Sequence, residues 1–194
     1  TRDDDPVSLD TFFCNVVPNE GEDRFSKTYK LVENENPDDV LALASIANSG
    51  FSFGSYENKP ADLRNTGYNE DFPSVTLLAF GVRKDCQGQG LGSLAFKKLL
   101  QMIRESSIAG VRLLILHPLE TAVSFYKSLG CVEVFNEEFQ DEVESMFIDI
   151  WHKLPTSSWL TPWLMVLSTC VQVSTQVCLS TPSLPACRSS GLSV

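Results

Sequence analysis

The period of the apolar positions along this chain changes most clearly between residues 75 and 106. Residues 75–82 form an almost unbroken apolar run, which is typical of a buried strand. A polar loop follows, and then three glycines at alternate positions, Gly88, Gly90 and Gly92. From there to about Ser106 apolar residues recur at helical spacing, and the predicted buried face holds Leu91, Leu94, Ala95, Leu99 and Met102. The pattern predicts a strand, a glycine-rich turn and a helix in immediate succession.

Similar patterns predict four shorter strands, at 28–32, 111–117, 131–135 and 146–151. A further helix is predicted from Pro118 to Leu129, with Gly130 as its stop. Strands and helices in this order favour a mixed sheet with helices packed on it.

The pattern does not determine the secondary structure of two segments. Residues 40–47 are rich in Ala and Leu and follow Pro37 with two acids, which favours a helix, but they also fit a strand. Residues 54–73 form a long polar connection, within which 60–64 is a short helical candidate. A connection of this length in a compact domain is more often functional than idle.

The glycine-rich turn suits an anion. The first turn of a helix carries N–H groups without intrahelical partners, and glycines let the backbone approach a bulky phosphate. Neither the dinucleotide fingerprint nor the Walker spacing fits, because the glycines of 88–92 are spaced G-x-G-x-G and no Gly-Lys-Ser/Thr follows. A tight turn that only serves helix–strand packing is the alternative.

Two blocks of sequence in the expected order, 79–92 and 117–134, resemble the GNAT superfamily of N-acetyltransferases. The segment 87–92, QGQGLG, is similar to the family's Q/R-x-x-G-x-G/A signature, which binds the pyrophosphate of acetyl-coenzyme A. The preceding 79–82, AFGV, resembles the strand end whose backbone pairs with the pantetheine arm, and 125–130, FYKSLG, resembles the family's FYxxLGF segment. The resemblance covers roughly 28–154 and implies an α/β fold, with a mixed, largely antiparallel twisted sheet flanked by helices. It also implies a strand over 40–53, and from this resemblance the chain is expected to lack the family's first strand and most of its first helix before Leu9.

The resemblance also implies the site residues. Tyr126 stands where the family's tyrosine protonates the departing thiolate, although a half-buried core tyrosine is the common fate of any Tyr on an amphipathic helix. The residues implied for acetyl-coenzyme A binding are Phe80, Gly81, Val82, Gln87, Gly88, Gln89, Gly90, Leu91, Gly92, Ser93, His117, Ala122 and Phe125. For His117, a capped strand end is an equal alternative. Three nearby cations, Arg83, Lys84 and Lys97, either assist the phosphates or are simply solvated.

No general base stands out. The carboxylates considered are Glu57, Glu70, Asp71 and Glu120, each of which also fits a solvated surface charge. Cys131 replaces the family's usual Phe and is not expected to act as a nucleophile, because nothing basic flanks it. We assign no role to His152.

Composition narrows the class of protein further. The chain has 194 residues and a formal net charge of -10, which argues against a general affinity for nucleic acid or anionic membrane. Its six cysteines form no CxxC pair and no metal-like spacing with only two histidines, so no metal site and a reduced, cytoplasmic protein are expected. The acidic, polar beginning has no signal-peptide pattern.

Three domains or segments are expected. Residues 1–10 are predicted to be disordered, and 11–154 to form an N-terminally shortened acetyltransferase domain. Residues 155–194 are rich in Ser and Thr with Arg188 as their one charge, and are expected outside the fold. Their apolar part, 159–179, is broken by Pro162 and is a weak membrane-anchor candidate. The sequence leaves a homodimer open.

The favoured function is transfer of acetyl from acetyl-coenzyme A to a primary amine, by direct attack in a ternary complex. One alternative is a non-catalytic module that binds coenzyme A or a partner protein on the same scaffold. A second follows from a resemblance of 9–13, 28–32, 59–73 and the FYKSLG helix to the toxin-type acetyltransferases of toxin–antitoxin modules, which modify aminoacyl-tRNA. The acidic charge balance disagrees with a tRNA substrate.

Overall fold

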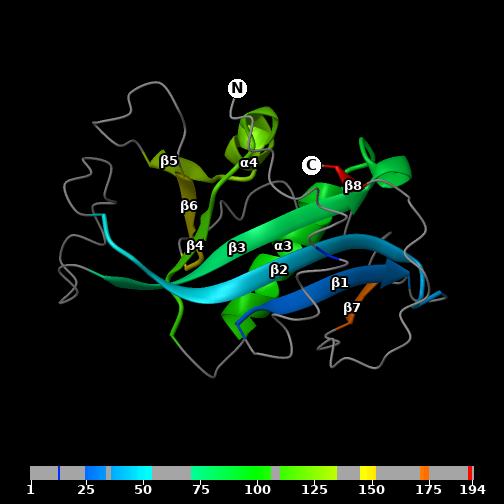
Figure 1. Ribbon diagram of the computed structural model, residues 1–194. Coiled ribbons are helices and arrows are strands. Elements are labelled where there is room, and N and C mark those ends of the chain that lie inside the picture. The colour runs from blue at the N-terminus through cyan, green and yellow to red at the C-terminus, as the bar shows by residue number, and fades with distance from the viewer. Residues whose placement is uncertain are drawn as a thin grey trace. The chain divides into compact units, whose positions relative to one another are not determined.

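The computed structural model describes residue 13 and residues 25–33, 36–53, 71–105, 110–134, 145–151, 171–174 and 192–193. The chain divides into two compact units. The first draws on Thr1–Ala47, Ala79–Leu99 and Pro155–Val194, and the second on Asn48–Leu78 and Leu100–Leu154. Figure 1 labels the elements, and the long elements β2, β3 and α3 each contribute residues to both units.

The first unit begins with an antiparallel pair of strands, β1 (Lys27–Glu33) and β2 (Val40–Phe51). Their register places Lys27 opposite Ile46 and Val32 opposite Val40, with an irregularity after Leu31. The strand expected over 28–32 is confirmed. So is the strand expected over 40–53, where composition alone had favoured a helix, because pairing with β1 and burial of its apolar side chains outweigh the helix propensity of Ala and Leu.

Two short strands from the region after residue 154 also pair within the first unit. β7 (Val171–Ser174) lies antiparallel to β1 over Lys30–Glu33, and β8 (Leu192–Ser193) pairs antiparallel with the end of β3 (Phe72–Arg83). Residues 155–194 as a whole were expected outside the fold. These two segments are instead hydrogen-bonded to the sheet.

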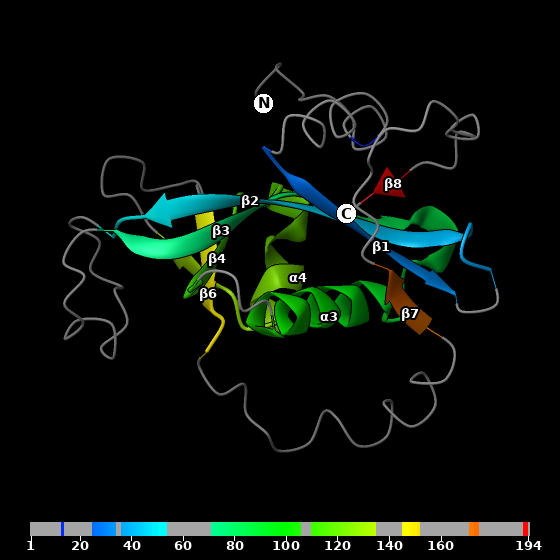
Figure 2. The same ribbon diagram turned by 90° about the horizontal axis from the view of Figure 1, so that it is seen from below.

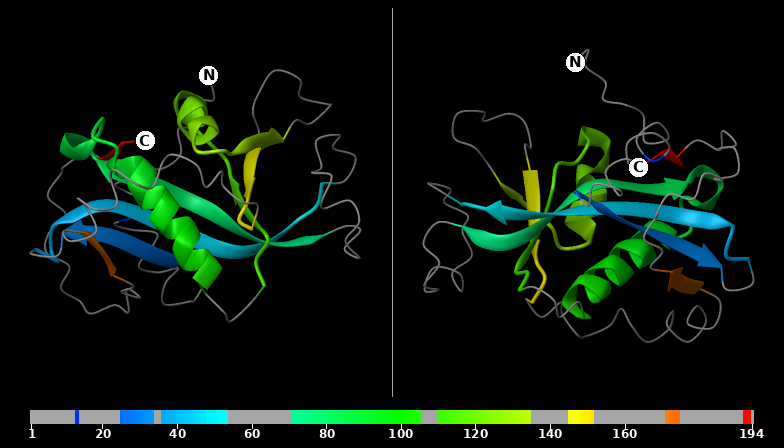
Figure 3. Two further views of the ribbon diagram at one scale, coloured as in Figure 1. Left: turned by 180° about the vertical axis from the view of Figure 1, so that it is seen from behind. Right: turned by 60° about the horizontal axis from the view of Figure 1, so that its bottom comes forward.

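Helix α3 (Leu91–Glu105) follows β3 through the short 3-10 helix η3 (Lys84–Cys86), as the change of period predicts. In the first unit, its residues 91–99 lie across one face of the strands (Figures 2 and 3). The buried positions of the whole helix are Ala95, Phe96, Leu99, Leu100 and Ile103. The predicted face is therefore slightly rotated: Leu91, Leu94 and Met102 are only half-buried, while Phe96 is fully buried with its ring edge-on to Phe80.

The second unit contains one parallel and several antiparallel ladders, in the strand order β5-β6-β4-β3-β2. β4 (Leu113–Leu116) runs parallel to β3 over Ser74–Leu77, and β6 (Ser145–Asp149) pairs antiparallel with both β4 and β5 (Val132–Val134). The four strands predicted from pattern are all present, although β4 to β6 are shorter than expected. The α/β fold class with a mixed, largely antiparallel sheet is confirmed.

The helix predicted from Pro118 begins later. Leu119 is extended, with φ -65° and ψ 149°, and the 3-10 helix η4 (Glu120–Ala122) precedes α4 (Val123–Ser128). The first turn closes by an i→i+3 bond from the amide of Ala122 to the carbonyl of Leu119, at 2.8 Å. Gly130 ends the helix at φ 91°, as predicted.

Aromatic rings fill the core of the second unit. Phe53 lies edge-on to Phe51, Phe72 and Phe147, with ring centroids 5.0, 5.6 and 5.1 Å away. These rings pack with three buried strand residues, Leu113, Ile115 and Val134. Edge-to-face pairs of this kind add to the free energy gained from burial alone.

Several expectations lie outside the described residues. They are the disordered segment 1–10, the helical candidate 60–64, His152 and the two carboxylates Glu57 and Glu70. Within the described part of the chain, no helix combines the length and the apolarity needed to cross a membrane.

Candidate active site

The turn between η3 and α3 has the geometry of an anion-binding helix start. Gly88 and Gly90 have φ angles of 72° and 79°, which side chains with a Cβ rarely adopt. The amide of Leu94 donates to the carbonyl of Gly90 at 3.1 Å, which is the first bond of the helix. The amides before Leu94 in this turn therefore have no intrahelical acceptor, and the helix dipole adds partial positive charge. The first turn of α3 contains no acidic side chain to neutralise it.

The space over this turn is open. A Cβ placed on Gly88 or Gly90 would meet no heavy atom within 4 Å, and the segment 88–90 is exposed. The glycines are thus required by backbone conformation rather than by crowding within the protein. An exposed turn with convergent amides can accept a phosphate group from solvent.

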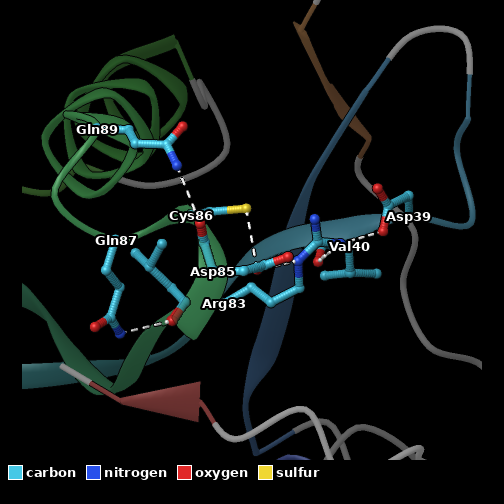
Figure 4. A network of polar contacts seen from close by, with 8 residues as sticks. Asp39, Val40, Arg83, Asp85, Cys86, Gln87 and Gln89 are labelled. Carbon is cyan, nitrogen blue, oxygen red and sulfur yellow. Dashed lines mark hydrogen bonds and ion pairs between the residues drawn. The ribbon is translucent and has the colours of Figure 1, made fainter.

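The two glutamines of the motif act on the turn itself. Gln87 donates through Nε2 to the carbonyl of Val82 at 3.0 Å, and Gln89 donates through Nε2 to the carbonyl of Asp85 at 3.0 Å (Figure 4). Both side chains therefore tie the glycine-rich turn to the strand end and to η3. Both residues were expected among the cofactor ligands, and in this structure their side chains hold the loop.

An ion-pair network braces the same loop. Arg83 bridges two carboxylates, donating through Nη1 to Asp39 Oδ1 and through Nε to Asp85 Oδ1, the latter at 2.7 Å. The Sγ of Cys86 lies 3.3 Å from the same Asp85 oxygen. Asp39 directly precedes β2, so the network fixes the end of β3 against the start of β2 (Figure 4).

The electrostatics of this network follow from its contacts. Hydrogen bonding to Asp85 raises the pKa of Arg83 above its usual range, and the same bond lowers the pKa of Asp85. Burial raises the pKa of the Cys86 thiol. The Arg83 charge is consequently committed to two carboxylates, which leaves Lys84 and Lys97 as the exposed cations of the predicted three.

Three further predicted residues form the strand end. Phe80, Gly81 and Val82 are buried in β3, and Phe80 contacts Phe96 of α3 with ring centroids 6.1 Å apart. Val82 and Arg83 pair with Ser193 and Leu192 of β8. Leu91, Gly92 and Ser93, which begin α3, are half-buried.

The remaining predicted residues belong to the second unit. His117 is exposed directly after β4, and Ala122 and Tyr126 form the buried side of the η4–α4 segment. Phe125 is half-buried, and its ring lies edge-on to Tyr126 with centroids 5.1 Å apart. Helical spacing from Pro118 to Leu129 places Ala122, Phe125 and Leu129 on one face, but of these three only Ala122 is buried, while Phe125 and Leu129 are half-buried.

Tyr126 is 4% exposed. Burial, with a smaller contribution from Cys131, raises its pKa well above the ordinary value of 10.0. Burial likewise raises the pKa of the Cys131 thiol to about 12. Both groups are therefore neutral throughout the physiological range, and the phenol keeps the proton that it needs to act as a hydrogen-bond donor.

Neither a base nor a metal centre emerges from the described residues. Asp71 and Glu120 are both exposed. No group of three or more His, Cys, Asp or Glu side chains that could hold a metal ion is present within the described ranges.

Sequence reasoning missed the positioning residues. Asp85 stands two positions after Arg83, so a local ion pair was readable from spacing. Asp39 lies 44 residues from Arg83, and only the pairing of β2 with the sheet brings the two together. No short stretch of the sequence indicates a contact between residues so far apart in the chain.

Comparison with known proteins agrees with this geometry. Residues 23–131, more than half of the chain, match the sequence model described as the Acetyltransferase (GNAT) family. A comparison with curated protein sequences finds no significant match.

Solved structures share the fold. A crystal structure of a KacT mutant aligns with a TM-score of 0.60 and 23% identity, over 72% of this chain and 80% of that one. AtaT complexed with acetyl-methionyl-tRNAfMet aligns with a TM-score of 0.60 and 24% identity, over 71% and 79%. AtaTR bound with AcCoA aligns with a TM-score of 0.56 and 24% identity, over 72% and 78%.

Proposed function

Because this chain belongs to the GNAT acetyltransferase family and is an acyltransferase, we propose that it moves acetyl from acetyl-coenzyme A to a primary amine. The observation that carries the proposal is the exposed helix start of α3, with two glycines at positive φ and no acid in the first turn. That arrangement suits the diphosphate of a nucleotide-bearing thiol carrier.

The residues that would hold acetyl-coenzyme A are those of the turn and the strand end. The amides of 88–93 bind the diphosphate, each such contact at a helix start contributing about 0.3–1 kcal/mol. Gln87 and Gln89 hold the turn in shape through their bonds to backbone carbonyls. The backbone of Phe80, Gly81 and Val82 pairs with the amide groups of the pantetheine arm, and His117, Ala122 and Phe125 complete the proposed set.

The reaction joins the acceptor nitrogen to the acetyl carbon as the carbon–sulfur bond breaks, so the amine loses a proton and the thiolate gains one. Acetyl-coenzyme A supplies the activated acetyl group as a thioester. A backbone amide at the strand end near Val82 polarises the carbonyl oxygen. Tyr126 donates the proton through its hydroxyl group.

Burial sets how Tyr126 can act. Because its pKa is raised, the phenol is a weaker acid than an exposed tyrosine, and a full proton transfer to a thiolate of pKa ~8.5 is uphill. A neutral donor in a dry environment still stabilises developing negative charge on sulfur by hydrogen bonding. The same burial favours the rival in which Tyr126 is a core residue of a module that binds coenzyme A without turnover.

Aminoacyl-tRNA is the second acceptor class to test. AtaT, whose complex contains acetyl-methionyl-tRNAfMet, shares the fold. The formal net charge of -10 works against a polyanionic partner, because tRNA binding needs a basic surface. We therefore favour a small or peptidic amine.

The decisive experiment is a thiol-release assay with acetyl-coenzyme A over a panel of amines, peptides and charged tRNAs, preceded by calorimetry without acceptor. Calorimetric binding with release of thiol on at least one amine is the expected result. Binding without release on any acceptor favours the non-catalytic module. Absence of binding contradicts the proposal.

Tyr126→Phe tests the proton donor. Loss of the hydroxyl group should lower turnover by roughly 10²–10⁴, with an unchanged Kd for acetyl-coenzyme A. Val123→Ala serves as the matched control, since it disturbs packing at a half-buried position of the same helix that lies outside the proposed binding set and leaves the hydroxyl in place. If Tyr126→Phe retains full turnover, the tyrosine is a packing residue only.

A further inference from the structure

The end of β3 carries a pairing that the proposed function does not explain. β4 pairs with β3 only over Ser74–Leu77, and β3 continues to Arg83. Over its last two residues it pairs antiparallel with β8, Val82 opposite Ser193 and Arg83 opposite Leu192. In Figure 1 β8 is the short red strand beside this end of β3, and in Figure 4 the faint red ribbon lies next to the Gln87 loop.

This pairing occupies the backbone to which the proposed function assigns the pantetheine arm. Each edge of a strand offers one set of N–H and C=O groups, which serves one extended partner at a time. The pantetheine arm carries amide groups and would add to the strand end as a peptide does. The two partners therefore compete for the same main-chain groups of Val82 and its neighbours.

We propose that β8 is an autoinhibitory strand, which occupies the edge of β3 at Val82–Arg83 and has to leave before acetyl-coenzyme A binds fully. The proposal rests on the proposed function. Two paired residues form a weak ladder, so acetyl-coenzyme A can displace β8 without another factor. The displacement costs only part of the free energy of acetyl-coenzyme A binding. Occupancy by β8 reduces the apparent affinity in proportion to the fraction of open molecules.

The binding loop is otherwise pre-formed, so access to the edge of β3 is the part of acetyl-coenzyme A binding that can be regulated. The Arg83 network and the two glutamine bonds hold the turn in place without β8. The amides of 88–93 begin a helix that is independent of residues 192–193. Removal of β8 should consequently raise affinity and leave the phosphate cradle unchanged.

The test is calorimetry with acetyl-coenzyme A on the 194-residue chain, on a chain ending at Ser190, and on a matched pair of variants. Ser193→Pro removes the backbone N–H of residue 193, which disfavours strand pairing, and Ser193→Ala keeps it. The shortened chain and Ser193→Pro should bind about 3- to 10-fold more tightly, with Ser193→Ala unchanged. A synthetic peptide of residues 188–194, added to the shortened chain, should weaken binding again as a competitor.

The outcomes separate this inference from the function on which it rests. Equal affinity of all four proteins, or weaker binding by the shortened chain, overturns autoinhibition and leaves the proposed function intact. Failure of every form to bind acetyl-coenzyme A overturns the proposed function itself, and the inference with it.

Discussion

Burial controls the protonation of two neighbouring side chains near the end of α4. Tyr126 and Cys131 are 4% and 5% exposed, and the amide of Cys131 donates to the carbonyl of Tyr126 at 3.1 Å. Desolvation raises both pKa values, so neither group ionises in the folded protein at neutral pH. This neutrality makes Tyr126 a constant donor and Cys131 a poor nucleophile, which agrees with the absence of a basic neighbour in the sequence.

The raised pKa of Cys131 predicts a loss of stability at alkaline pH. In the unfolded chain the thiol ionises near its ordinary value of 9.0, whereas in the folded protein it ionises at about 12. The stabilisation is complete below pH 9 and is lost as the pH rises from 9 to 12, with a slope of about 1.4 kcal/mol per pH unit. Urea denaturation at pH 8 to 11 measures it.

Cys131→Ala should remove the contribution of one titrating proton from the pH dependence of the free energy of unfolding. The part of the pH dependence that remains above pH 10 is expected to come from Tyr126. Val134→Ala is the control, because it removes a buried side chain without removing a titratable group. A Cys131→Ala curve that runs parallel to the unsubstituted protein over pH 9–11 would contradict the assignment.

The positive φ of Gly90 gives a second residue-scale prediction. Gly90→Val should weaken acetyl-coenzyme A binding about 5- to 30-fold, because the left-handed conformation costs a β-branched residue roughly 1–2 kcal/mol and no neighbour clashes. Gly90→Asn should cost less than threefold, since Asn tolerates this conformation. Calorimetry measures both. Equal losses would mean that side-chain bulk near the phosphates, and not backbone strain, is what matters.

At the scale of elements, periodicity accounts for what the sequence predicted. β1, β3 and α3 carry long, regular patterns, and their bounds agree closely with expectation. Residues of β2 form a strand because they pair with β1. The family resemblance predicted this strand correctly, whereas composition favoured a helix. The start of α4 was wrong, because Pro118 permits a helix start but does not require one, and the chain stays extended through Leu119.

The candidate site follows the same division. The glycines and the helix start were readable, because both the conformational need and the spacing are local. The roles of the Gln87 and Gln89 side chains were not, since a glutamine donates equally well to a ligand or to a backbone carbonyl. The bond from Arg83 to Asp39 depends on how β2 and β3 lie, which no short window of sequence contains.

The Arg83 network gives a prediction for the loop as an element. Arg83→Lys keeps the charge but loses the guanidinium fork that bridges Asp39 and Asp85. We expect the KM for acetyl-coenzyme A to rise roughly 3- to 10-fold with little change in kcat, because the loop is positioned less well and the chemistry is untouched. Steady-state kinetics at saturating acceptor measures the effects on KM and on kcat separately.

Lys97→Ala is the matched control, since it removes an exposed positive charge from the first half of α3. If Lys97→Ala raises KM as much as Arg83→Lys does, phosphate binding depends on summed charge. The positioning role of the network would then be wrong.

At the scale of the whole molecule, the region after residue 154 changes the picture that composition gives. It carries almost no charge, and the alternation of residues 171–174, VQVS, is too short to have predicted a strand. β7 nevertheless pairs with β1 over four residues, Lys30–Glu33, and covers a strand that would otherwise be a free edge. An uncovered edge with an apolar neighbourhood invites pairing between molecules.

Truncation at two points tests this contribution. A chain ending at Ser174 keeps β7 and loses β8, whereas a chain ending at Leu154 loses both. The first should denature in urea almost as the full chain does. The second should lose roughly 2–4 kcal/mol, because about four ladder residues give up their net hydrogen bonding, and should scatter light on concentration. If both truncated chains match the full chain in stability and solubility, β7 is a dispensable appendage and the expectation from composition stands.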